Sequence, residues 1–408
     1  MNEQLIVKNF GPIKDATVDF KRVTVFIGPT GGGKSTLAKL AAVFRDERTY
    51  FEFKSREFII EYYSMGKYSR EGTLLQYKSK NIVYSFDENL TSSSSSNGDV
   101  TLSKDEASAL EKDVTDVKNK FDELLQSIPS LDIIADNPEY AKDKENAIEY
   151  IKKLGNILAR HKHIVTSSRP YYIPSERTFL PSIEYSWAGL LRDDIGLPKS
   201  ILQFANDFST SRKSVQELSI SFFNIKYIHQ NGQDFIEVPG VETLFRLYET
   251  ASGIQSVTPL LVLLEHLSRS TEQAQSFIIE EPELNLYPTA QQGLLNWLVE
   301  KCTKGENDLT LTTHSPYILS HLNLLLYAHH VGNKDEEKRQ KVAAIIPEKY
   351  WVNPDEFAAY YVNGPEGAGG VRSLLDPETK LISQNELDAV SGIQADEFDQ
   401  LLDINRGF

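Results

Sequence analysis

The stretch of sequence that decides the fold is Gly28-Pro29-Thr30-Gly31-Gly32-Gly33-Lys34-Ser35, which fits the pattern of glycine, four residues, then Gly-Lys-Ser. Glycine has no Cβ, so the backbone can wind until successive N–H groups point at one anion. The apolar run Val23–Ile27 before it is typical of a buried strand, and residues 34–44 after it have apolar side chains at helical spacing. A strand, a glycine-rich turn and a helix in this order predict a phosphate-binding loop rather than a flexible turn.

The residue types in this loop indicate how it would hold ATP and Mg²⁺. The N-terminal end of a helix carries partial positive charge and free N–H groups, which favour phosphate. Lys34 is expected to contact the β and γ phosphates, Ser35 to ligate magnesium, and Thr36 to bond the α-phosphate. ATP and Mg²⁺ are therefore the predicted cofactors.

A second strand pattern, far downstream, ends in carboxylates: Phe277-Ile278-Ile279-Glu280-Glu281-Pro282-Glu283. Glu280 is expected to hold Mg²⁺, directly or through water, and Glu281 to polarise the attacking water. Many phosphate-loop ATPases have aspartate where Glu280 stands, and the longer side chain favours a water-mediated contact. The alternative is that two adjacent acids belong to a solvated loop.

A third strand pattern, at residues 309–313, ends at His314. A neutral histidine at a strand tip can hydrogen-bond the γ-phosphate and respond to its loss. A lone histidine is otherwise typical of a structural residue with satisfied hydrogen bonds. The position of His314 shortly after the acids favours the first interpretation, so Lys34, Glu281 and His314 form the predicted catalytic group.

Four stretches resemble the ABC-type ATPases of the SMC, RecF and overcoming-lysogenization-defect (OLD) group. They are Asn9-Phe10-Gly11-Pro12-Ile13, Thr250-Ala251-Ser252-Gly253-Ile254-Gln255-Ser256, Glu280-Glu281-Pro282-Glu283-Leu284-Asn285-Leu286-Tyr287-Pro288 and Thr313-His314-Ser315-Pro316. The resemblance implies an α/β fold: an ABC-type P-loop ATPase with a mixed sheet and an antiparallel β subdomain. It covers both ends of the ATPase and leaves residues 65–164 and the last sixty residues unmatched.

The resemblance also implies a homodimer in which two copies enclose two ATP molecules. Ser252 and Gly253 of one copy would contact the γ-phosphate held by the other, and Asn285 would lie where the D-loop crosses the interface. Without the resemblance, Ser252 and Gly253 would be an ordinary helix start. The glutamine of the family's Q-loop has no assigned position, and the role of Tyr172-Ile173-Pro174-Ser175-Glu176-Arg177 is open between a surface ion pair and a nucleotide or interface contact.

The chain divides into an ATPase part at 1–64, an insertion at 65–164, a second ATPase part at 165–345 and an accessory segment at 346–408. Within the insertion, residues 74–86 predict a strand pair. Apolar residues with heptad spacing at 107–128, resumed at 147–158, predict an inserted helical hairpin, a short coiled coil. The alternative is two amphipathic helices lying flat on the ATPase.

Composition narrows the class of protein. A single cysteine, Cys302, excludes an intrachain disulfide, and the apolar runs are too short to span a bilayer, so a cytoplasmic location without membrane contact is expected. The formal net charge of −15 argues against broad nonspecific binding of nucleic acid. A local exception is the basic cluster of Lys152, Lys153, Arg160, Lys162 and Arg169, which could follow a phosphate backbone or form a solvated helix face.

The predicted function is an ATP-hydrolysing switch that dimerises around ATP and controls a separate effector, a nuclease or toxin, in antiphage defence. Nucleases of the OLD group carry spaced carboxylates after the ATPase, and no Asp-x-Asp follows His314 here, so a partner is expected to do any cutting. The alternative is a DNA-repair or recombination ATPase of the RecF or SMC kind. A transporter subunit fits poorly because of the long insertion.

Overall fold

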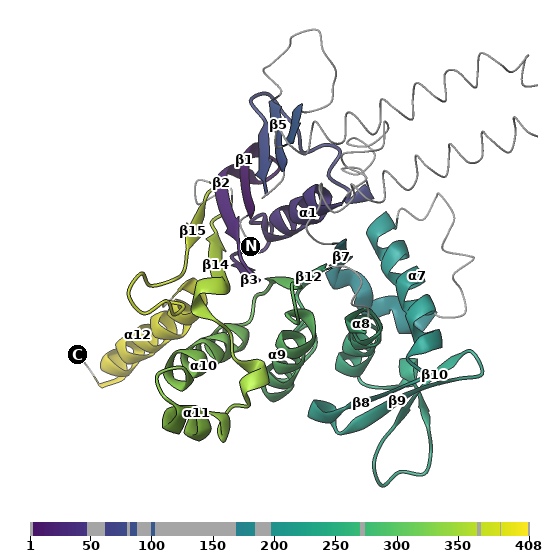
Figure 1. Cartoon of the computed structure of the whole chain (residues 1–408). Helices are drawn as coiled ribbons and strands as arrows, with labels where there is room; N and C mark the ends of the chain where they lie inside the picture. The colour runs from purple at the N-terminus through teal and green to yellow at the C-terminus, as the bar shows by residue number, and fades with distance from the viewer. Residues whose placement is uncertain are drawn as a thin grey trace, which may run out of the picture.

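The computed structural model describes residues 3–46, 62–79, 82–87, 99–102, 169–183, 197–269, 274–364, 369–383 and 385–406. The predicted helical hairpin and the basic residues Lys152, Lys153, Arg160 and Lys162 lie outside these ranges. Within them, the chain builds three sheets, of six, five and four strands. The six-stranded sheet runs through the middle of the molecule, with helices on both sides (Figure 1).

The central sheet has the strand order β15-β14-β3-β13-β12-β7. Its strands are β3 (Val23–Ile27), β7 (Arg169–Ile173), β12 (Gln275–Glu280), β13 (Asp308–Thr312), β14 (Phe357–Val362) and β15 (Val371–Ser373). All neighbours pair in parallel except β14 and β15. The carboxyl ends of β3, β13 and β12 therefore meet at one edge, where parallel sheets place their ligand sites.

Alternate side chains of the central strands enter two different cores. Val25 and Ile27 of β3 pack with α7 (Lys199–Ser214), α8 (Ser252–Ser268), α9 (Pro288–Cys302) and α10 (Pro316–Gly332). Phe26 points the other way, into a core formed with α1 (Lys34–Arg45). The strands read as continuous apolar runs because both faces are covered, as expected for parallel sheets.

The antiparallel sheet has the order β2-β1-β4-β5-β6. Its strands are β1 (Glu3–Phe10), β2 (Ile13–Phe20), β4 (Leu74–Lys78), β5 (Ile82–Asp87) and β6 (Asp99–Leu102). The strand pair predicted within 74–86 is present as β4 and β5. Side chains of β1 and β2 close over α1 in the second core, so the α/β fold with a mixed sheet and an antiparallel β subdomain is confirmed.

The third sheet is a meander of β8 (Glu217–Ile220), β9 (Ile225–Gln230), β10 (Gln233–Glu237) and β11 (Phe245–Arg246). Asn231 and Gly232 have φ values of 52° and 74° and form the hairpin turn that the Asn-Gly pair predicts. The alternating apolar stretch 220–228 is divided between β8 and β9. A short 3-10 turn, Ser221–Phe223, interrupts it, and Asn224 then adopts φ 52°, which no extended strand tolerates.

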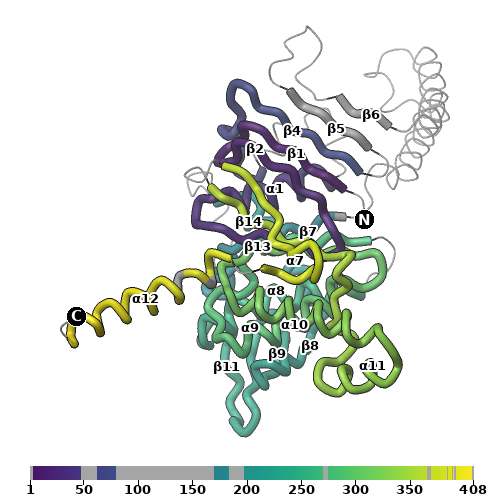
Figure 2. Tube along the Cα trace, turned by 90° about the vertical axis from the view of Figure 1, so that its left-hand side faces the viewer, coloured from purple at the N-terminus to yellow at the C-terminus, as the bar shows by residue number. Residues whose placement is uncertain are grey.

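The segment after α10 returns to the central sheet. It contains α11 (Glu336–Ala343), then β14 and β15, and ends in α12 (Glu386–Arg406), which extends away from the body (Figure 2). An ion pair between Arg372 of β15 and Glu386, 2.5 Å long, fastens the start of α12. Within the described residues, no helix combines the length and the apolar character needed to cross a membrane.

Candidate functional site

The phosphate loop connects β3 to α1, as the sequence predicts. Gly28 has φ 145° and Gly33 has φ 107°, conformations that side chains with a Cβ rarely adopt. A Cβ on Gly28 would also lie inside the van der Waals radius of the carbonyl oxygen of Val362, the last residue of β14. The loop therefore needs glycine both for its winding and for its packing against the neighbouring strand.

Lys34 lies at the centre of this loop. Its Nζ donates hydrogen bonds to the carbonyl oxygens of Gly28 (3.0 Å) and Pro29 (2.9 Å). Burial lowers the pKa of Lys34, and the acids of the strand β12 turn, above all Glu281 and then Glu280, oppose that effect. The ammonium group is thus within electrostatic reach of Glu281, the predicted catalytic acid, and of Glu280, the predicted magnesium ligand.

Glu280 ends β12 as a buried carboxylate. Burial raises its pKa, and Lys39 is the largest opposing influence. The hydroxyl groups of Tyr172 and Ser35 also oppose the effect of burial, and the net shift of the pKa is upward. Oε1 of Glu280 has no hydrogen-bond partner in the described part of the chain. Glu280 and Ser35, the two predicted magnesium ligands, are therefore neighbours, and one carboxylate oxygen is left without a protein donor.

Glu281 and His314 meet at the mouth of the site. Nε2 of His314 lies 3.6 Å from Oε1 of Glu281, with both side chains partly exposed. Burial and the charge of Lys34 lower the pKa of His314, while Glu281 raises it, and the net shift is downward. The imidazole is therefore neutral at pH 7, and the structure brings Lys34, Glu281 and His314 close together.

Glu283 joins the two strand ends that carry Glu281 and His314. Its Oε1 accepts hydrogen bonds from Oγ1 of Thr313 (2.6 Å) and from the backbone N–H of His314 (2.9 Å). The backbone N–H of Glu281 in turn donates to the carbonyl oxygen of Thr312 (2.9 Å). Glu283 is the third acid of the stretch 280–283, and the sequence alone indicates no function for it.

Arg177 is a site residue whose place was not predicted. The surface ion pair with Glu176 is wrong, because Arg177 has 0% of its surface exposed and hydrogen-bonds to backbone carbonyl oxygens. Its guanidinium donates to the carbonyl oxygens of Glu280 (2.7 Å) and Glu281 (2.8 Å). Burial lowers the pKa of Arg177 to about 10, against the charges of Glu283 and the other nearby acids, so the group stays a cation.

The predicted interface residues lie together at the start of α8 and in the turn after β12. A Cβ on Gly253 would lie 2.7 Å from the carbonyl oxygen of Asn285, so the two backbones touch. Ser252 and Asn285 are exposed, and Tyr287 beside them is 77% exposed. Arg169, the one residue of the basic cluster within the described ranges, begins β7.

The residues present fit ATP and Mg²⁺. The amine of Lys34 is satisfied by loop carbonyl groups that it can exchange for phosphate oxygens, and Oε1 of Glu280 is free to accept from a metal-bound water. The described residues include no group of three or more His, Cys, Asp or Glu side chains placed to hold a metal. Mg²⁺ needs no such group, since it keeps several waters and takes one or two protein ligands with phosphate oxygens.

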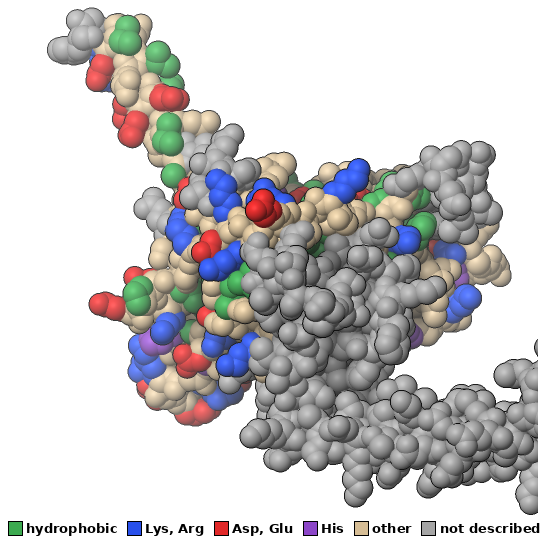
Figure 3. Space-filling model, turned by 90° about the horizontal axis from the view of Figure 1, so that it is seen from above, with side chains coloured by type: hydrophobic (Ala, Val, Ile, Leu, Met, Phe, Trp, Pro, Cys, Tyr) green, Lys and Arg blue, Asp and Glu red, His purple; other side chains and the backbone are tan. Residues whose placement is uncertain are grey.

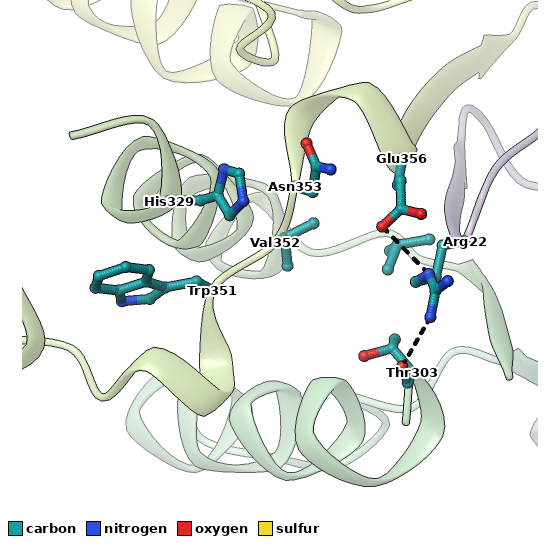
Figure 4. A pocket seen from close by; sticks show the side chains of 8 residues that line it. Arg22, Thr303, His329, Trp351, Val352, Asn353 and Glu356 are labelled. Carbon is teal, nitrogen blue, oxygen red and sulfur yellow. Dashed lines mark hydrogen bonds and ion pairs between the residues drawn. The ribbon is translucent and has the colours of Figure 1, made fainter. Parts of the chain in front are cut away.

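A separate cavity of about 300 Å³ lies at the opposite edge of the sheet, where Arg22 precedes β3 (Figure 4). Nε of Arg22 lies 3.2 Å from Oε2 of Glu356, and its Nη1 donates to the carbonyl oxygen of Thr303 (3.3 Å). The cavity is also lined by Val23, His329, Trp351, Val352 and Asn353. The cavity is at the amino ends of the strands and shares no residue with the phosphate loop or the acids.

Solved structures similar to this chain include two SMC head domains and RecF. The SMC head domain of Pyrococcus furiosus bound to the C-terminal domain of ScpA has 11% identity and a TM-score of 0.34, covering 78% of this chain and 90% of that one. The SMC head domain from Thermotoga maritima has 13% identity and a TM-score of 0.37, covering 79% and 92%. The recombination mediator protein RecF-ATPrS of the RecFOR pathway has 13% identity and a TM-score of 0.32, covering 91% and 97%.

No curated protein matches the sequence. A family model does: residues 23–320 match the family described as "AAA domain, putative AbiEii toxin, Type IV TA system". The matched range begins at β3 and includes the phosphate loop, the acids of the β12 turn and His314. The chain therefore belongs to this family of AAA-domain proteins.

Proposed function

We propose that the chain is an ATP-binding and ATP-hydrolysing switch that dimerises around ATP and controls a separate effector protein. The observation that carries the proposal is the convergence of Lys34, Glu281 and His314 from three different strand ends. A cation, a carboxylate and a neutral imidazole close together can bind phosphate, activate water and hydrogen-bond the transferred group, which are the tasks of phosphoryl transfer to water.

Each side chain has a distinct task. Lys34 releases the carbonyl oxygens of Gly28 and Pro29 and binds the β and γ phosphates. Glu281 orients the attacking water and takes its proton, while His314, neutral at pH 7, hydrogen-bonds to the γ-phosphate. When bound, Mg²⁺ held by Ser35 and Glu280 supplies charge that neutralises the phosphate oxygens.

The proposed homodimer uses the exposed residues beside Gly253. Ser252, Asn285 and Tyr287 are exposed, and the close approach of Gly253 to the carbonyl oxygen of Asn285 brings the start of α8 next to the turn after β12. The helix start offers free N–H groups, so the surface can accept the γ-phosphate held by a second copy. A symmetric dimer then completes both sites at once, because each copy gives and receives the same contact.

The proposed effector contact is α12. Ile393, Phe398, Leu401 and Ile404 are 57%, 61%, 63% and 69% exposed, and Figure 3 shows apolar and acidic side chains along this projecting helix. A row of large apolar side chains facing solvent is typical of a protein interaction surface. This exposed apolar surface supports a partner protein that binds α12.

Charge indicates the kind of partner that α12 would bind. Asp396, Asp399 and Asp403 recur at steps of three and four, so they share one side of the helix next to the apolar residues. Two copies of α12 would bring these carboxylates together, which disfavours pairing with a second copy. An effector with an apolar groove bordered by Lys or Arg fits this surface better.

The alternative, an ATPase of the RecF or SMC kind that acts directly on DNA, rests on the basic cluster of the insertion. Lys152, Lys153, Arg160 and Lys162 lie outside the described residues. DNA-stimulated hydrolysis that is lost on charge reversal at Lys152, Lys153 and Arg160 would favour this alternative. Equal turnover and equal dimerisation with and without DNA would exclude it.

The experiment that tests the switch is ATP turnover measured together with molar mass. The proposal expects slow hydrolysis by the wild-type chain and an ATP-dependent doubling of the mass in light scattering. When the chain is tagged, co-expressed with the products of neighbouring genes and purified under native conditions, one effector protein should copurify with it. A chain that stays monomeric with ATP and releases no phosphate would refute the proposal.

A further inference from the structure

The turn that carries Glu281 has an unusual backbone. Glu281 has φ 41°, in the left-handed region that side chains with a Cβ avoid. Such a residue keeps this conformation only when its surroundings fix it. The conformation matters because it sets the direction in which the carboxylate leaves β12.

Arg177 holds this turn from both sides. Its Nη1 donates to the carbonyl oxygen of Glu280 (2.7 Å), and its Nη2 donates to the carbonyl oxygen of Glu281 (2.8 Å). These two oxygens belong to the peptide groups before and after the Cα of Glu281. One planar guanidinium therefore restrains both dihedral angles of the residue.

A third hydrogen bond holds the guanidinium group of Arg177 close to its own segment of the chain. Nη1 makes a further hydrogen bond to the carbonyl oxygen of Pro174 (3.0 Å), at the end of β7. β7 pairs in parallel with β12, so Arg177 and the turn that it holds follow two adjacent strands. Arg177 has 0% exposure, so solvent does not compete for these hydrogen bonds.

We propose that Arg177 is a positioning residue that aims the Glu281 carboxylate by holding its left-handed turn. The inference rests on the proposed function of Glu281 and adds the residue through which that function is maintained. Arg177 itself does not touch the substrate. Its planar fork suits two carbonyl oxygens at once, whereas lysine would supply a single ammonium.

The first test compares Arg177→Lys with Arg45→Lys. Arg45 is a matched control, because it is also a buried arginine that binds the central sheet, through Asp308 at the amino end of β13 (2.9 Å). In Arg177→Lys, kcat should fall by roughly 10–100-fold, since a small misplacement of a catalytic group has effects of this size. The Kd for ATP should stay within about twofold, because the phosphate loop is untouched.

Arg45→Lys should lower the melting temperature without a selective loss of kcat. A parallel loss of kcat, ATP affinity and melting temperature in both variants would mean that Arg177 acts only as a buried structural group, and the inference would be overturned.

The second test is a double-mutant cycle with Glu281→Gln in single-turnover hydrolysis. If Arg177 acts through Glu281, the variant carrying both changes should be no slower than Glu281→Gln alone. Rates that fall by the product of the two single effects would show independent damage and contradict the inference.

Crystal structures of Arg177→Lys and Arg45→Lys supply a readout that does not depend on turnover. Residue 281 should leave the left-handed region in the first variant and keep it in the second. A left-handed Glu281 in Arg177→Lys would overturn the clamp even if the wild type hydrolyses ATP. A wild type without turnover would refute the proposed function, whereas the crystal structures would still decide the role of Arg177.

Discussion

Nε2 of His314 lies 3.6 Å from Oε1 of Glu281, so the imidazole contacts the carboxylate that is proposed to activate water. The pKa of His314 is lowered from 6.5 by burial and by Lys34. Above pH 6.5 the ring is therefore neutral and leaves the carboxylate free to accept a proton. When the pH falls through the lowered pKa, the imidazolium pairs with Glu281 and competes with water.

The pH dependence of turnover follows from this contact. The single-turnover rate should be constant from pH 7 to 8 and should decline on the acid side of the usual histidine pKa of 6.5. Replacing His314 with Gln keeps a neutral donor and removes this titration, so the acid limb should move to lower pH. An identical acid limb in His314→Gln would mean that a group other than His314 titrates, such as Glu280 or Glu283, whose pKa values are both raised by burial.

Replacing Lys34 with Ala should weaken ATP binding. The variant loses the cation that is proposed to bind the β and γ phosphates, and the expected increase in Kd is on the order of tenfold or more. A fluorescent ATP analogue measures this directly. Lys213→Ala, which removes an exposed lysine near the end of α7, is the control and should bind as the wild type does.

Replacing Glu281 with Gln should separate binding from hydrolysis. The amide keeps the shape of the side chain but cannot accept the proton, so turnover should fall by roughly 10²–10⁴-fold. ATP affinity should be retained, and the dimer should accumulate in light scattering. Unchanged turnover would remove Glu281 from the catalytic group, while Glu337→Gln, at an exposed acid on α11, should change neither measurement.

Replacing Gly28 with Ala should destabilise the loop more than replacing Gly31. Both glycines have positive φ, but a Cβ on Gly28 would meet the carbonyl oxygen of Val362, whereas one on Gly31 meets no atom within 4 Å. The free energy of unfolding should fall by about 1–3 kcal/mol in Gly28→Ala because backbone must shift. Thermal unfolding without nucleotide tests this, and equal effects of the two variants would contradict it.

Changing Leu401 and Ile404 to Lys should abolish recovery of the effector and leave ATP turnover intact. Both side chains face solvent on α12, so the protein should fold normally. Val241→Lys, at an exposed apolar residue in the loop after β10, is the matched control and should retain the effector. Recovery of the same partner by the double variant would exclude α12 as the docking surface.

Local sequence patterns predicted much of the fold and of the candidate site. β3 occupies the predicted range, and the predicted helix after the phosphate loop is α1, because each is specified by its own apolar periodicity. The positions of Glu280, at the end of β12, and of His314, two residues beyond the end of β13, followed from the two strand patterns before them. Local patterns do not show which strands are neighbours in the sheet or in which register they pair, and it is this pairing that places the two residues side by side.

Two features could not be read from the sequence. β14 lies beside β3, although Phe357 and Val23 are far apart in the chain, and only the folded sheet pairs them. Arg177 follows an exposed glutamate in a polar stretch, which is typical of a surface turn. Its burial depends on backbone carbonyl oxygens just after β7 and at the end of β12. Every residue has such a carbonyl oxygen, so the residue types do not show which of them will bind Arg177.

The contact between Gly28 and Val362 connects the last part of the chain to the phosphate loop. Val362 ends β14, which pairs with β15, and Arg372 of β15 ties down Glu386 at the root of α12. The first turn of α12 is thus connected through one ion pair and two paired strands to the backbone of the phosphate loop. A partner that displaces α12 would act first on Arg372 and β15, and only through β14 on Gly28.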